Sequence, residues 1–411
     1  MSTAQALDPV VVRTTEVDPQ GLLLAHLPED GEPVAWVREG EGLVGWGVAA
    51  STEVLGPRRF AEAEAWWRRV CAGLDVQDDL GVPGSGPVAF GTFAFADDSA
   101  ERSRLVLPQV VLGRRDGRAW VTTVGRAGAP VTTPPPPRTP LGITYASGSQ
   151  PVTEWRAAVV AAVKRIRAGE LGKVVLAYDV LAHAQEPVDP RHLLARLAER
   201  YASSWTFAVD GFVGATPELL VCRDGRTVTS RVLAGTMPRA GDPESDRVIE
   251  HALATSAKDR GEHAYALDSL VDALRPHCRT LTASDEPYVL GLANVLHLAS
   301  DVDGELADGS SALALAAALH PTAAVGGTPT DIAVDLIDEL EPMDRGRYAG
   351  PVGWVDARGD GEWGIALRCA EVQGATVRMF AGCGIVADSD PDAEVVEAQA
   401  KLLPIRDALE S

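Results

Sequence analysis

Acidic side chains recur at helical spacing in two segments that lie far apart in the sequence. Glu394, Glu397 and Lys401 are three and four residues apart, and Asp259 and Glu262 are three apart in the second segment. Residues at these spacings share one face of a helix. Taken alone, each group is typical of a solvated helix surface. If the two helices meet, four carboxylates repel one another unless a cation lies between them.

Mg²⁺ is the cation that such a cluster favours, because it prefers oxygen ligands and commonly keeps several waters. The sequence therefore suggests a magnesium site formed by Asp259, Glu262, Glu394 and Glu397. The alternative is two solvated faces, with a Glu397–Lys401 pair contributing only ~0.3–0.5 kcal/mol. The five cysteines form no CxxC pair and no Cys/His cluster with zinc spacing. We read them as reduced thiols of a cytosolic protein.

A lysine and a glutamate stand at the starts of two apolar segments. Lys173 precedes the run 174–177, and Glu218 precedes the run 219–221. The lysine can instead extend along the apolar surface and place its ammonium in water. A buried amine is a candidate base near neutral pH, and a buried carboxyl with a raised pKa is a candidate acid. Together they would flank a substrate.

The elements that position these residues mix helices and strands without regular alternation. Helices are predicted over residues 57–74, 153–170, 190–201, 244–275, 310–319, 330–341 and 391–409. Strands are predicted over residues 36–49, 87–95, 119–125, 173–180, 205–210, 218–223, 227–231, 351–356, 362–371 and 375–380. The last helix has Asp390 as its N-cap and Pro391 in its first turn. This pattern predicts an α+β fold.

Three regions are distinguished along the chain. Residues 1–130 are rich in short strands, residues 131–140 form a proline-rich connector, and residues 141–411 carry the acids and the two candidate catalytic residues. The connector cannot form a helix or a paired strand. It either separates two domains or bridges two halves of one.

One glycine pattern is a false signal. Gly382, Gly384 and Ala387 match the GxGxxA pattern after a strand. A dinucleotide fold would start a helix inside that loop and then add a second strand with an acidic residue. Here the next helix begins only near Pro391, so we reject a dinucleotide site.

Charge and hydropathy exclude several classes of protein. The chain has 411 residues, with 37 Lys and Arg against 58 Asp and Glu, a formal charge of −21. This balance argues against nucleic acid and against an anionic membrane surface. The first 30 residues do not resemble a signal peptide, and the longest apolar run, 312–319, is too short to span a bilayer. We expect a cytoplasmic protein.

Several long motifs resemble the chorismate-utilising enzymes, which include isochorismate, salicylate, anthranilate and aminodeoxychorismate synthases. The resemblance covers residues 150–411. It is densest in AGTMPRAGD (234–242), SAKDRGEH (256–263), LHLAS (296–300), LHPTAAVGGTP (319–329), RGRYAGPVGW (345–354) and AGCGIVADSDPDAEVVEAQAK (381–401). It implies a single large α+β domain of two packed antiparallel β-sheets with helices outside. Residues 1–130 would then supply part of those sheets, and the proline run would be a surface loop.

The resemblance also implies roles for individual residues. Glu262 and Glu397 resemble the main Mg²⁺ ligands, with Asp259 and Glu394 beside them. Lys173 resembles the base that activates water, and Glu218 the acid that protonates the departing hydroxyl. The substrate-binding residues would be His297, Ala324, Tyr348, Arg368, Gly382, Gly384 and Lys401.

A few positions separate the members of the family. Lys173 points to water as the nucleophile, because the anthranilate synthases lack this lysine and add ammonia. Ala234 stands where aminodeoxychorismate synthases carry a nucleophilic lysine, and Ala324 where salicylate synthases and the aminating enzymes usually have threonine. Tyr178 and Met237 depart from common family residues, which affects substrate contacts and not the acid or base.

These positions favour an isochorismate synthase that depends on Mg²⁺ and feeds menaquinone or siderophore biosynthesis. The alternatives are salicylate synthase, which goes on to eliminate pyruvate, and a non-catalytic protein that binds chorismate or Mg²⁺. We expect chorismate as the small-molecule partner, a monomer, and no glutaminase subunit.

Overall fold

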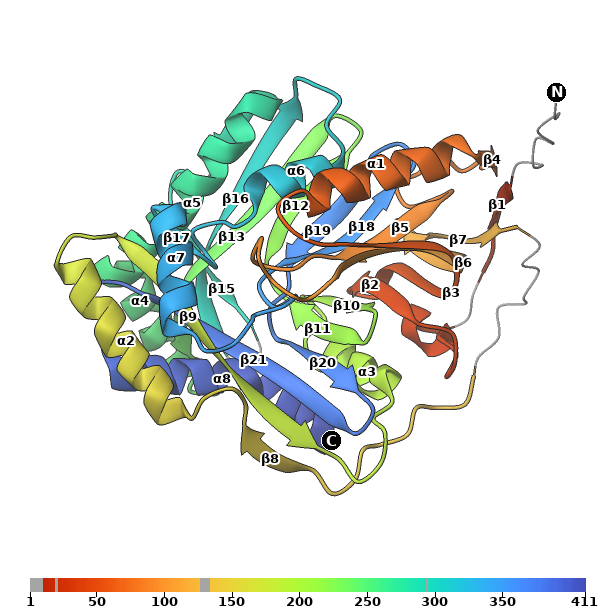
Figure 1. Ribbon diagram of the computed structural model, residues 1–411. Helices are drawn as coiled ribbons and strands as arrows, with labels where there is room; N and C mark the ends of the chain where they lie inside the picture. Colours follow the sequence, from red (N-terminus) through yellow and green to blue (C-terminus); the bar gives the residue numbers. More distant parts are fainter. Residues whose placement is uncertain (1–9, 19–20, 126–133, 293–294) are drawn as a thin grey trace.

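The computed structural model describes residues 10–18, 21–125, 134–292 and 295–411, and helices lie outside its β-sheets (Figure 1). The α-helices are α1 (Arg59–Ala72), α2 (Val152–Arg167), α3 (Pro190–Arg200), α4 (Pro243–Thr255), α5 (Ala257–Leu274), α6 (Ala312–Leu319), α7 (Thr330–Leu340) and α8 (Pro391–Glu410). Short 3-10 helices are η1 (Leu23–His26) and η2 (Arg275–His277).

The strands are spread over the whole described chain. The first half contains β1 (Val10–Glu16), β2 (Val34–Arg38), β3 (Glu41–Val54), β4 (Leu74–Gln77), β5 (Val88–Thr92), β6 (Ser103–Arg115), β7 (Arg118–Val124), β8 (Thr144–Ser147), β9 (Lys173–His183) and β10 (Trp205–Val209). The second half contains β11 (Phe212–Thr216), β12 (Leu219–Asp224), β13 (Thr227–Pro238), β14 (Cys278–Ala283), β15 (Tyr288–Gly291), β16 (Val295–Leu306), β17 (Gly327–Thr328), β18 (Pro351–Asp356), β19 (Gly361–Ile365), β20 (Cys369–Gln373) and β21 (Thr376–Ile385).

These strands build two sheets that share the long strands β3 and β6. One sheet runs from β2 through β10, β11, β20 and β21 to β9. The other runs from β5 through β18, β19, β12 and β13 to β16. β2 pairs with β3, β5 pairs with β6, and β3 pairs with β6, so the hydrogen-bonded network is continuous. The described ladders are antiparallel except for the one between β1 and β4. The predicted α+β fold of two antiparallel sheets is confirmed.

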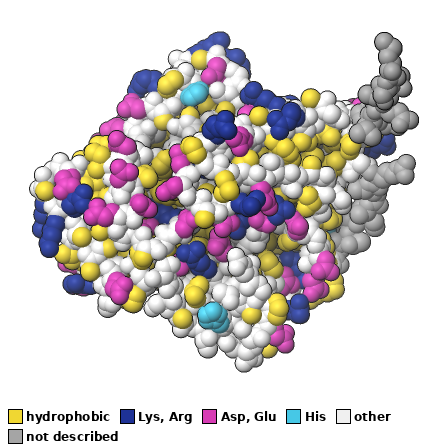
Figure 2. Space-filling view, viewed as in Figure 1, with side chains coloured by type: hydrophobic (Ala, Val, Ile, Leu, Met, Phe, Trp, Pro, Cys, Tyr) yellow, Lys and Arg dark blue, Asp and Glu magenta, His cyan; other side chains and the backbone are white. Residues whose placement is uncertain are grey.

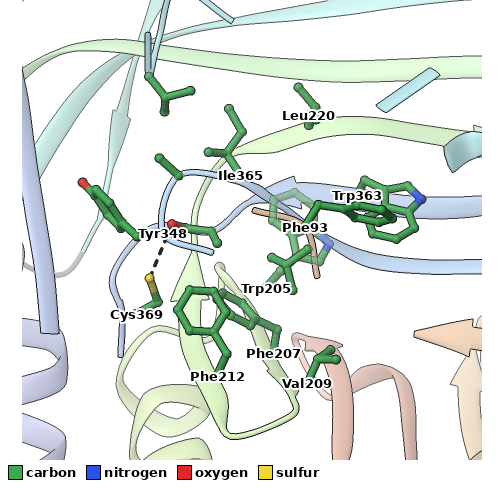
Figure 3. Close-up of a cluster of buried hydrophobic side chains, with 14 of the residues drawn as sticks. Phe93, Trp205, Phe207, Val209, Phe212, Leu220, Tyr348, Trp363, Ile365 and Cys369 are labelled. Atoms are coloured by element: carbon green, nitrogen blue, oxygen red, sulfur yellow. Dashed lines mark hydrogen bonds between the residues drawn. The ribbon is translucent and has the colours of Figure 1, made fainter. Parts of the chain in front are cut away.

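Helices cover the outer side of each sheet. α6 packs against both α1 and α5; α5 and α6 cover β13 and β12, and α1 covers β3 and β6. On the other side, α2 packs against β9 and β21, α7 against β9 and α8 against β21. The inner sides meet in an aromatic core (Figure 3). There the rings of Phe93 and Trp363 meet edge to face at 5.6 Å, and Phe207 contacts Phe212 at 5.8 Å. Such pairs contribute roughly 0.5–1.5 kcal/mol beyond their burial.

Two parts of the predicted secondary structure are wrong. The helix expected over 244–275 is two helices, because Ser256 has extended backbone angles and caps α5 with its side chain. The predicted ranges also miss the strands β1, β4, β6, β8, β11 and β14–β17. β16 begins with six consecutive buried residues, 295–300, which carry no alternating pattern.

The connector and the surface complete the fold. Residues 134–140 have no regular structure, residues 131–133 lie outside the described residues, and Arg191 of α3 donates a hydrogen bond to the Pro135 carbonyl. Acidic and basic side chains are interspersed over the face in Figure 2. Among the described residues, no helix combines the length and apolar character that a bilayer crossing requires.

Candidate active site

A small cavity lies where β9 and β21 face β13 and β16. Its volume is about 50 Å³. A cavity of about 150 Å³ accommodates benzene, so a ring-sized ligand must push the wall of this one apart. The predicted residues on its wall are Glu218, Glu262, His297, Ala324, Tyr348, Arg368, Gly382, Gly384 and Lys401.

Lys173 is the first residue of β9, and its side chain is fully buried. Its Nζ lies 3.1 Å from Oε1 of Glu262 on α5, without a well-aligned hydrogen bond to any described residue. Gly384 on the neighbouring β21 permits this approach, since a Cβ there would lie 2.1 Å from Glu262 Oε1 and 2.9 Å from Lys173 Cε. The lysine therefore points into the protein, toward the acidic helix.

Glu218 lies in the short link between β11 and β12, and only 4% of it is exposed. Thr216 Oγ1 accepts a hydrogen bond from the Glu218 N–H at 3.3 Å and donates one to the Ile365 carbonyl at 2.6 Å, which fixes this link. Burial raises the pKa of Glu218 to about 7, although the nearby Lys173 acts in the opposite direction. A carboxyl with this pKa retains a proton that it can donate near neutral pH.

Asp259 and Glu262 lie on α5 as the spacing predicts. Ser256 caps the helix: its hydroxyl accepts a hydrogen bond from the Asp259 N–H at 3.2 Å and donates one to the Asp259 carboxylate. Burial raises the pKa of Asp259. Burial also acts to raise the pKa of Glu262, but three lysines, of which Lys173 acts most strongly, hold it below its usual value. Glu262 is therefore a carboxylate at neutral pH.

Helix α8 presents the second pair of acids. It begins after its predicted cap, Asp390. Lys258 of α5 donates a hydrogen bond to Glu394 of α8 at 2.8 Å, so the two acidic helices are in contact. Lys401 pairs with Glu397 at 2.6 Å. The two carboxylate pairs thus lie close together, with lysines between them.

The carboxylates on α8 suit a hard divalent cation. Glu394 is 1% exposed, and its Oε2 has no hydrogen-bond partner among the described residues. Burial and then the charge of Glu397 raise the pKa of Glu394. Ligand atoms of Glu394, Glu397 and Cys383 lie within 4.8 Å of one another. Burial raises the pKa of the Cys383 thiol far above its usual value, so the carboxylate oxygens are the donors that fit Mg²⁺.

Sequence reasoning missed Lys258. Burial alone would lower its pKa, but Glu394, and after it Glu262 and Glu397, raise the pKa overall. Lys258 is therefore a charged partner of the acid cluster. A signal existed in the sequence, because Lys258 and Glu262 are four residues apart on one helix.

Arg368 and His297 form a second polar group on the cavity wall. The Arg368 backbone has a φ of +49°, an unusual conformation for a residue with a side chain. Its Nη2 donates a hydrogen bond to His297 Nε2 at 3.3 Å, and His297 Nδ1 lies 3.0 Å from Thr236 Oγ1. Burial, then Arg368 and Lys401, lower the pKa of His297 well below its usual value, so its ring is neutral.

Lys401 and Tyr348 complete this side of the cavity. The Lys401 ammonium donates a hydrogen bond to the Gly382 carbonyl at 2.9 Å. Tyr348 stacks on Phe380 at 5.1 Å and borders the aromatic core in Figure 3. Burial raises the pKa of Tyr348, so its phenol keeps its proton.

Ala324 lies in the segment between α6 and β17, and a buried ion pair anchors this segment. Arg345 contacts Glu341 at 2.6 Å and donates hydrogen bonds to the carbonyls of Val325, at 2.9 Å, and Val175, at 2.7 Å. The pair thus ties the loop beside Ala324 to β9. Sequence reasoning missed both members of the pair, although Arg345 opens one of the family motifs.

The arrangement gathers the predicted residues in one place. Asp259, Lys173, Glu394 and Glu397 are not on the cavity wall. Asp259 is packed beside Gly235, Lys173 lies next to Glu262 and Glu397 next to Lys401, all three of which line the cavity, and Glu394 lies beside Glu397. A buried amine, a carboxyl with a pKa near 7 and an acid cluster therefore adjoin one cavity. Such a site can move protons while it holds an anion.

The chain is similar to several known proteins. The family model described as chorismate binding enzyme matches residues 3–131 and 131–410. The isochorismate synthase DhbC of Bacillus subtilis is 43% identical over 273 residues, covering 63% of this chain and 69% of that protein. The salicylate biosynthesis isochorismate synthase of Pseudomonas aeruginosa is 35% identical over 439 residues, covering 99% and 92%.

The fold has a solved counterpart. The structure of MenF, the menaquinone-specific isochorismate synthase of Escherichia coli, superposes with a TM-score of 0.81 at 24% identity, over 99% of this chain and 96% of that one. This structural similarity shows the fold. The family model and the sequence relatives show which protein family the chain belongs to. The chain therefore belongs to the family of chorismate-binding enzymes.

Proposed function

We propose that this chain is an isochorismate synthase, which adds water at C2 of chorismate and removes the hydroxyl at C4. The observation that carries the proposal is the position of Lys173 and Glu218. Both are buried, one at the start of β9 and the other in the link between β11 and β12, and they adjoin one cavity together with the acid cluster. The relatives named above are isochorismate synthases, which supports the same activity here.

Substrate capture must be local. The net charge of −21 repels a dianion such as chorismate at long range. Arg368 and Lys401 place positive charge on the cavity wall, and arginine can hold a carboxylate through two parallel hydrogen bonds. Tyr348 adds a hydroxyl donor. We assign the substrate carboxylates to these residues.

Mg²⁺ is part of the proposal, with Glu262, Glu394 and Glu397 as the residues that would hold it and Asp259 beside them. The unsatisfied oxygen of Glu394 and its proximity to Glu397 support this assignment. When bound, the ion would neutralise the acids and polarise the ring carboxylate, so that the conjugated diene accepts electrons more readily.

The proton steps use the lysine and the glutamate. Lys173 in its amine form takes a proton from water, and the oxygen of that water forms a bond to C2. The double bonds shift, the C4–O bond breaks, and the protonated Glu218 supplies the proton with which the hydroxyl leaves as water. One water enters and one leaves, so the overall change is an isomerisation. Each proton transfer is worth roughly 10²–10⁴ in rate.

The choice of reaction rests on side chains that are absent from the cavity wall. Ala234 offers no amine and Ala324 no hydroxyl, and both line the cavity. Water is then the nucleophile and no ammonia donor is required. We therefore propose that the enzyme needs no glutaminase subunit and acts as a monomer.

The product would feed menaquinone or siderophore biosynthesis. The five cysteines are free, which fits the proposed cytoplasmic location.

Product chromatography tests this proposal. Purified protein with chorismate and Mg²⁺ should yield isochorismate without salicylate or pyruvate. Salicylate together with pyruvate would identify a salicylate synthase, and unchanged chorismate would identify a binding protein. Lys173→Ala should abolish most turnover while chorismate still binds, and near-normal turnover would contradict its role as the base.

A further inference from the structure

A cysteine of β21 lies behind the cavity wall. Its neighbours Gly382 and Gly384 line the cavity, and successive residues of a strand point to opposite faces. Cys383 therefore faces α8, where its Sγ donates a hydrogen bond to the Glu394 carbonyl at 3.4 Å. Only 1% of Cys383 is exposed, and its thiol is free. No proton step or substrate contact described above uses this thiol.

Two carboxylates meet the thiol at this point. Ligand atoms of Cys383, Glu394 and Glu397 lie within 4.8 Å of one another. Zn²⁺ holds sulfur at about 2.3 Å and carboxylate oxygen at about 2.0–2.2 Å, so the ligand atoms of one zinc ion lie at most about 4.5 Å apart. The three groups therefore need only small movements of their side chains to hold one ion.

One oxygen of this set is available to a cation. Lys258 donates a hydrogen bond to Oε1 of Glu394 at 2.8 Å, whereas Oε2 of the same carboxylate is buried and has no partner among the described residues. Glu394 is 1% exposed, and a buried polar atom without a partner is costly. A free carboxylate oxygen beside a free thiol indicates a metal ligand set rather than ion pairing alone.

We propose that Cys383, Glu394 and Glu397 form a site for a thiophilic divalent cation such as Zn²⁺. Sulfur ligands select such cations, whereas Mg²⁺ takes oxygen ligands. Because the raised pKa of the Cys383 thiol keeps it protonated without a metal, only a cation with a strong preference for sulfur replaces the proton, which passes to the solvent.

This site shares both of its carboxylates with the proposed Mg²⁺ site. Zn²⁺ bound to Cys383 therefore withdraws Glu394 and Glu397 from Mg²⁺ and inhibits the enzyme. The inhibition rests on the proposed function, whereas the binding of the cation does not.

Cobalt gives the first test, because Co²⁺ bound to a thiolate absorbs in the near ultraviolet by sulfur-to-metal charge transfer. We expect one equivalent of Co²⁺ to produce this band in the native protein, and both Cys383→Ala and Cys383→Ser to lose it. Cys369→Ala is the matched control and should keep the band. The Cys369 thiol (Figure 3) is also buried and donates to a carbonyl at 3.4 Å, but among the described residues it has no such pair of carboxylates. No band in the native protein, or an equal band in the Cys383 variants, would overturn the proposal.

Calorimetry compares the two metals without substrate. The Kd for Zn²⁺ should rise at least ~10–100-fold in Cys383→Ala, since even a residue that only hydrogen-bonds a metal ligand contributes this much, while the Kd for Mg²⁺ changes less than about twofold. Equal Zn²⁺ affinity in the native protein and the variant would contradict the assignment of the thiol as a ligand.

Inhibition gives the last readout. Zn²⁺ should suppress isochorismate formation by the native enzyme, and excess Mg²⁺ should reverse the effect. Cys383→Ala should need at least ~10 times more Zn²⁺ for the same fractional loss of its own rate. A cobalt band that depends on Cys383 in a protein without chorismate turnover would contradict the proposed function alone.

Discussion

At the scale of single residues, the site depends on close packing of opposite charges. Lys173 is fully buried, and its nearest charged group is Glu262 at 3.1 Å. Glu218 is buried nearby and has a pKa of about 7. A buried charge without a partner is strongly unfavourable. The pairing of these groups therefore determines both the stability of the site and its ability to transfer protons.

Glu218→Gln should lower kcat by about 10²–10⁴-fold with little change in KM, because the amide cannot donate a proton to the leaving hydroxyl. In the native enzyme the acid must be protonated to act. With a pKa of about 7, the acid loses its proton as the pH rises through this value, so kcat should fall there. Measuring kcat against pH checks both points. A variant whose residual activity declines above pH 7 as the native enzyme does would contradict the assignment.

Gly384→Ala should abolish most activity, because the added Cβ would overlap the Glu262 carboxylate at 2.1 Å and approach Lys173 Cε at 2.9 Å. The matched control is Gly261→Ala on α5, where a Cβ meets nothing within 4 Å. That control should keep activity and stabilise the protein by roughly 0.5–1 kcal/mol. Steady-state assays with urea unfolding measure both effects. Full activity in Gly384→Ala would show that the contact is not needed.

At the scale of elements, a side-chain ion pair takes the place of a strand along β9. β17 pairs with β9 only at Lys173 and Val174, and β8 pairs with it only from Val180 onward. Between them, Arg345 donates to the Val175 carbonyl and Glu341 accepts from the Ala177 N–H at 2.7 Å. This edge of β9 is thereby satisfied without a neighbouring strand, and the base at its start is held in place.

Arg345→Met should therefore destabilise the protein by about 3–5 kcal/mol, because it leaves Glu341 charged and buried without its partner. Glu341→Gln should cost less, since its amide oxygen can still accept from the Ala177 N–H. Urea unfolding of both variants gives the two free energies of unfolding. Equal losses would mean that leaving Arg345 unpaired costs as much as leaving Glu341 unpaired, which contradicts the prediction.

The sequence predicted elements with strong periodicity and missed those fixed by tertiary contacts. The acidic pairs on α5 and α8 could be predicted from their spacing, and the cap Asp390 from its residue type. The β14–β16 strands could not, because β14 and β15 are short and the first half of β16 is a continuous buried run without alternation.

For the candidate site too, only part of the arrangement could be predicted from the sequence. The roles assigned to its residues came from a resemblance between long motifs. Lys258 and Arg345 were not identified. Each has an acid four residues away, but the contacts that define their roles, with Glu394 and with the Val175 carbonyl, join distant parts of the sequence. No local pattern reveals such partners, whereas a residue whose neighbours lie on its own helix shows its partner by spacing.

At the scale of the whole molecule, the acid cluster joins the two sheets. α5 packs against β13 of one sheet, and α8 packs against β21 of the other. The hydrogen bond between Lys258 and Glu394 spans the two helices. A cation held between these helices would therefore connect both halves of the fold.

Mg²⁺ should raise the free energy of unfolding of the native protein, by about 2.7 kcal/mol at a concentration 100 times its Kd. Glu394→Gln should remove most of this increase, because it replaces a carboxylate of the cluster. Glu199→Gln, an exposed position on α3, is the control and should leave it intact. Thermal or urea unfolding with and without Mg²⁺ provides the measurement. Equal stabilisation in Glu394→Gln would place the ion elsewhere.

The pairing of distant strands has a consequence for how the chain acquires its structure. β2 pairs with β10, and β5, near residue 90, pairs with β18, near residue 353. Contacts between such remote segments require large loops to close before any energy is gained, so chains of this kind fold slowly and through intermediates with unpaired strand edges. We expect refolding from urea to show several kinetic phases and a yield that falls as protein concentration rises.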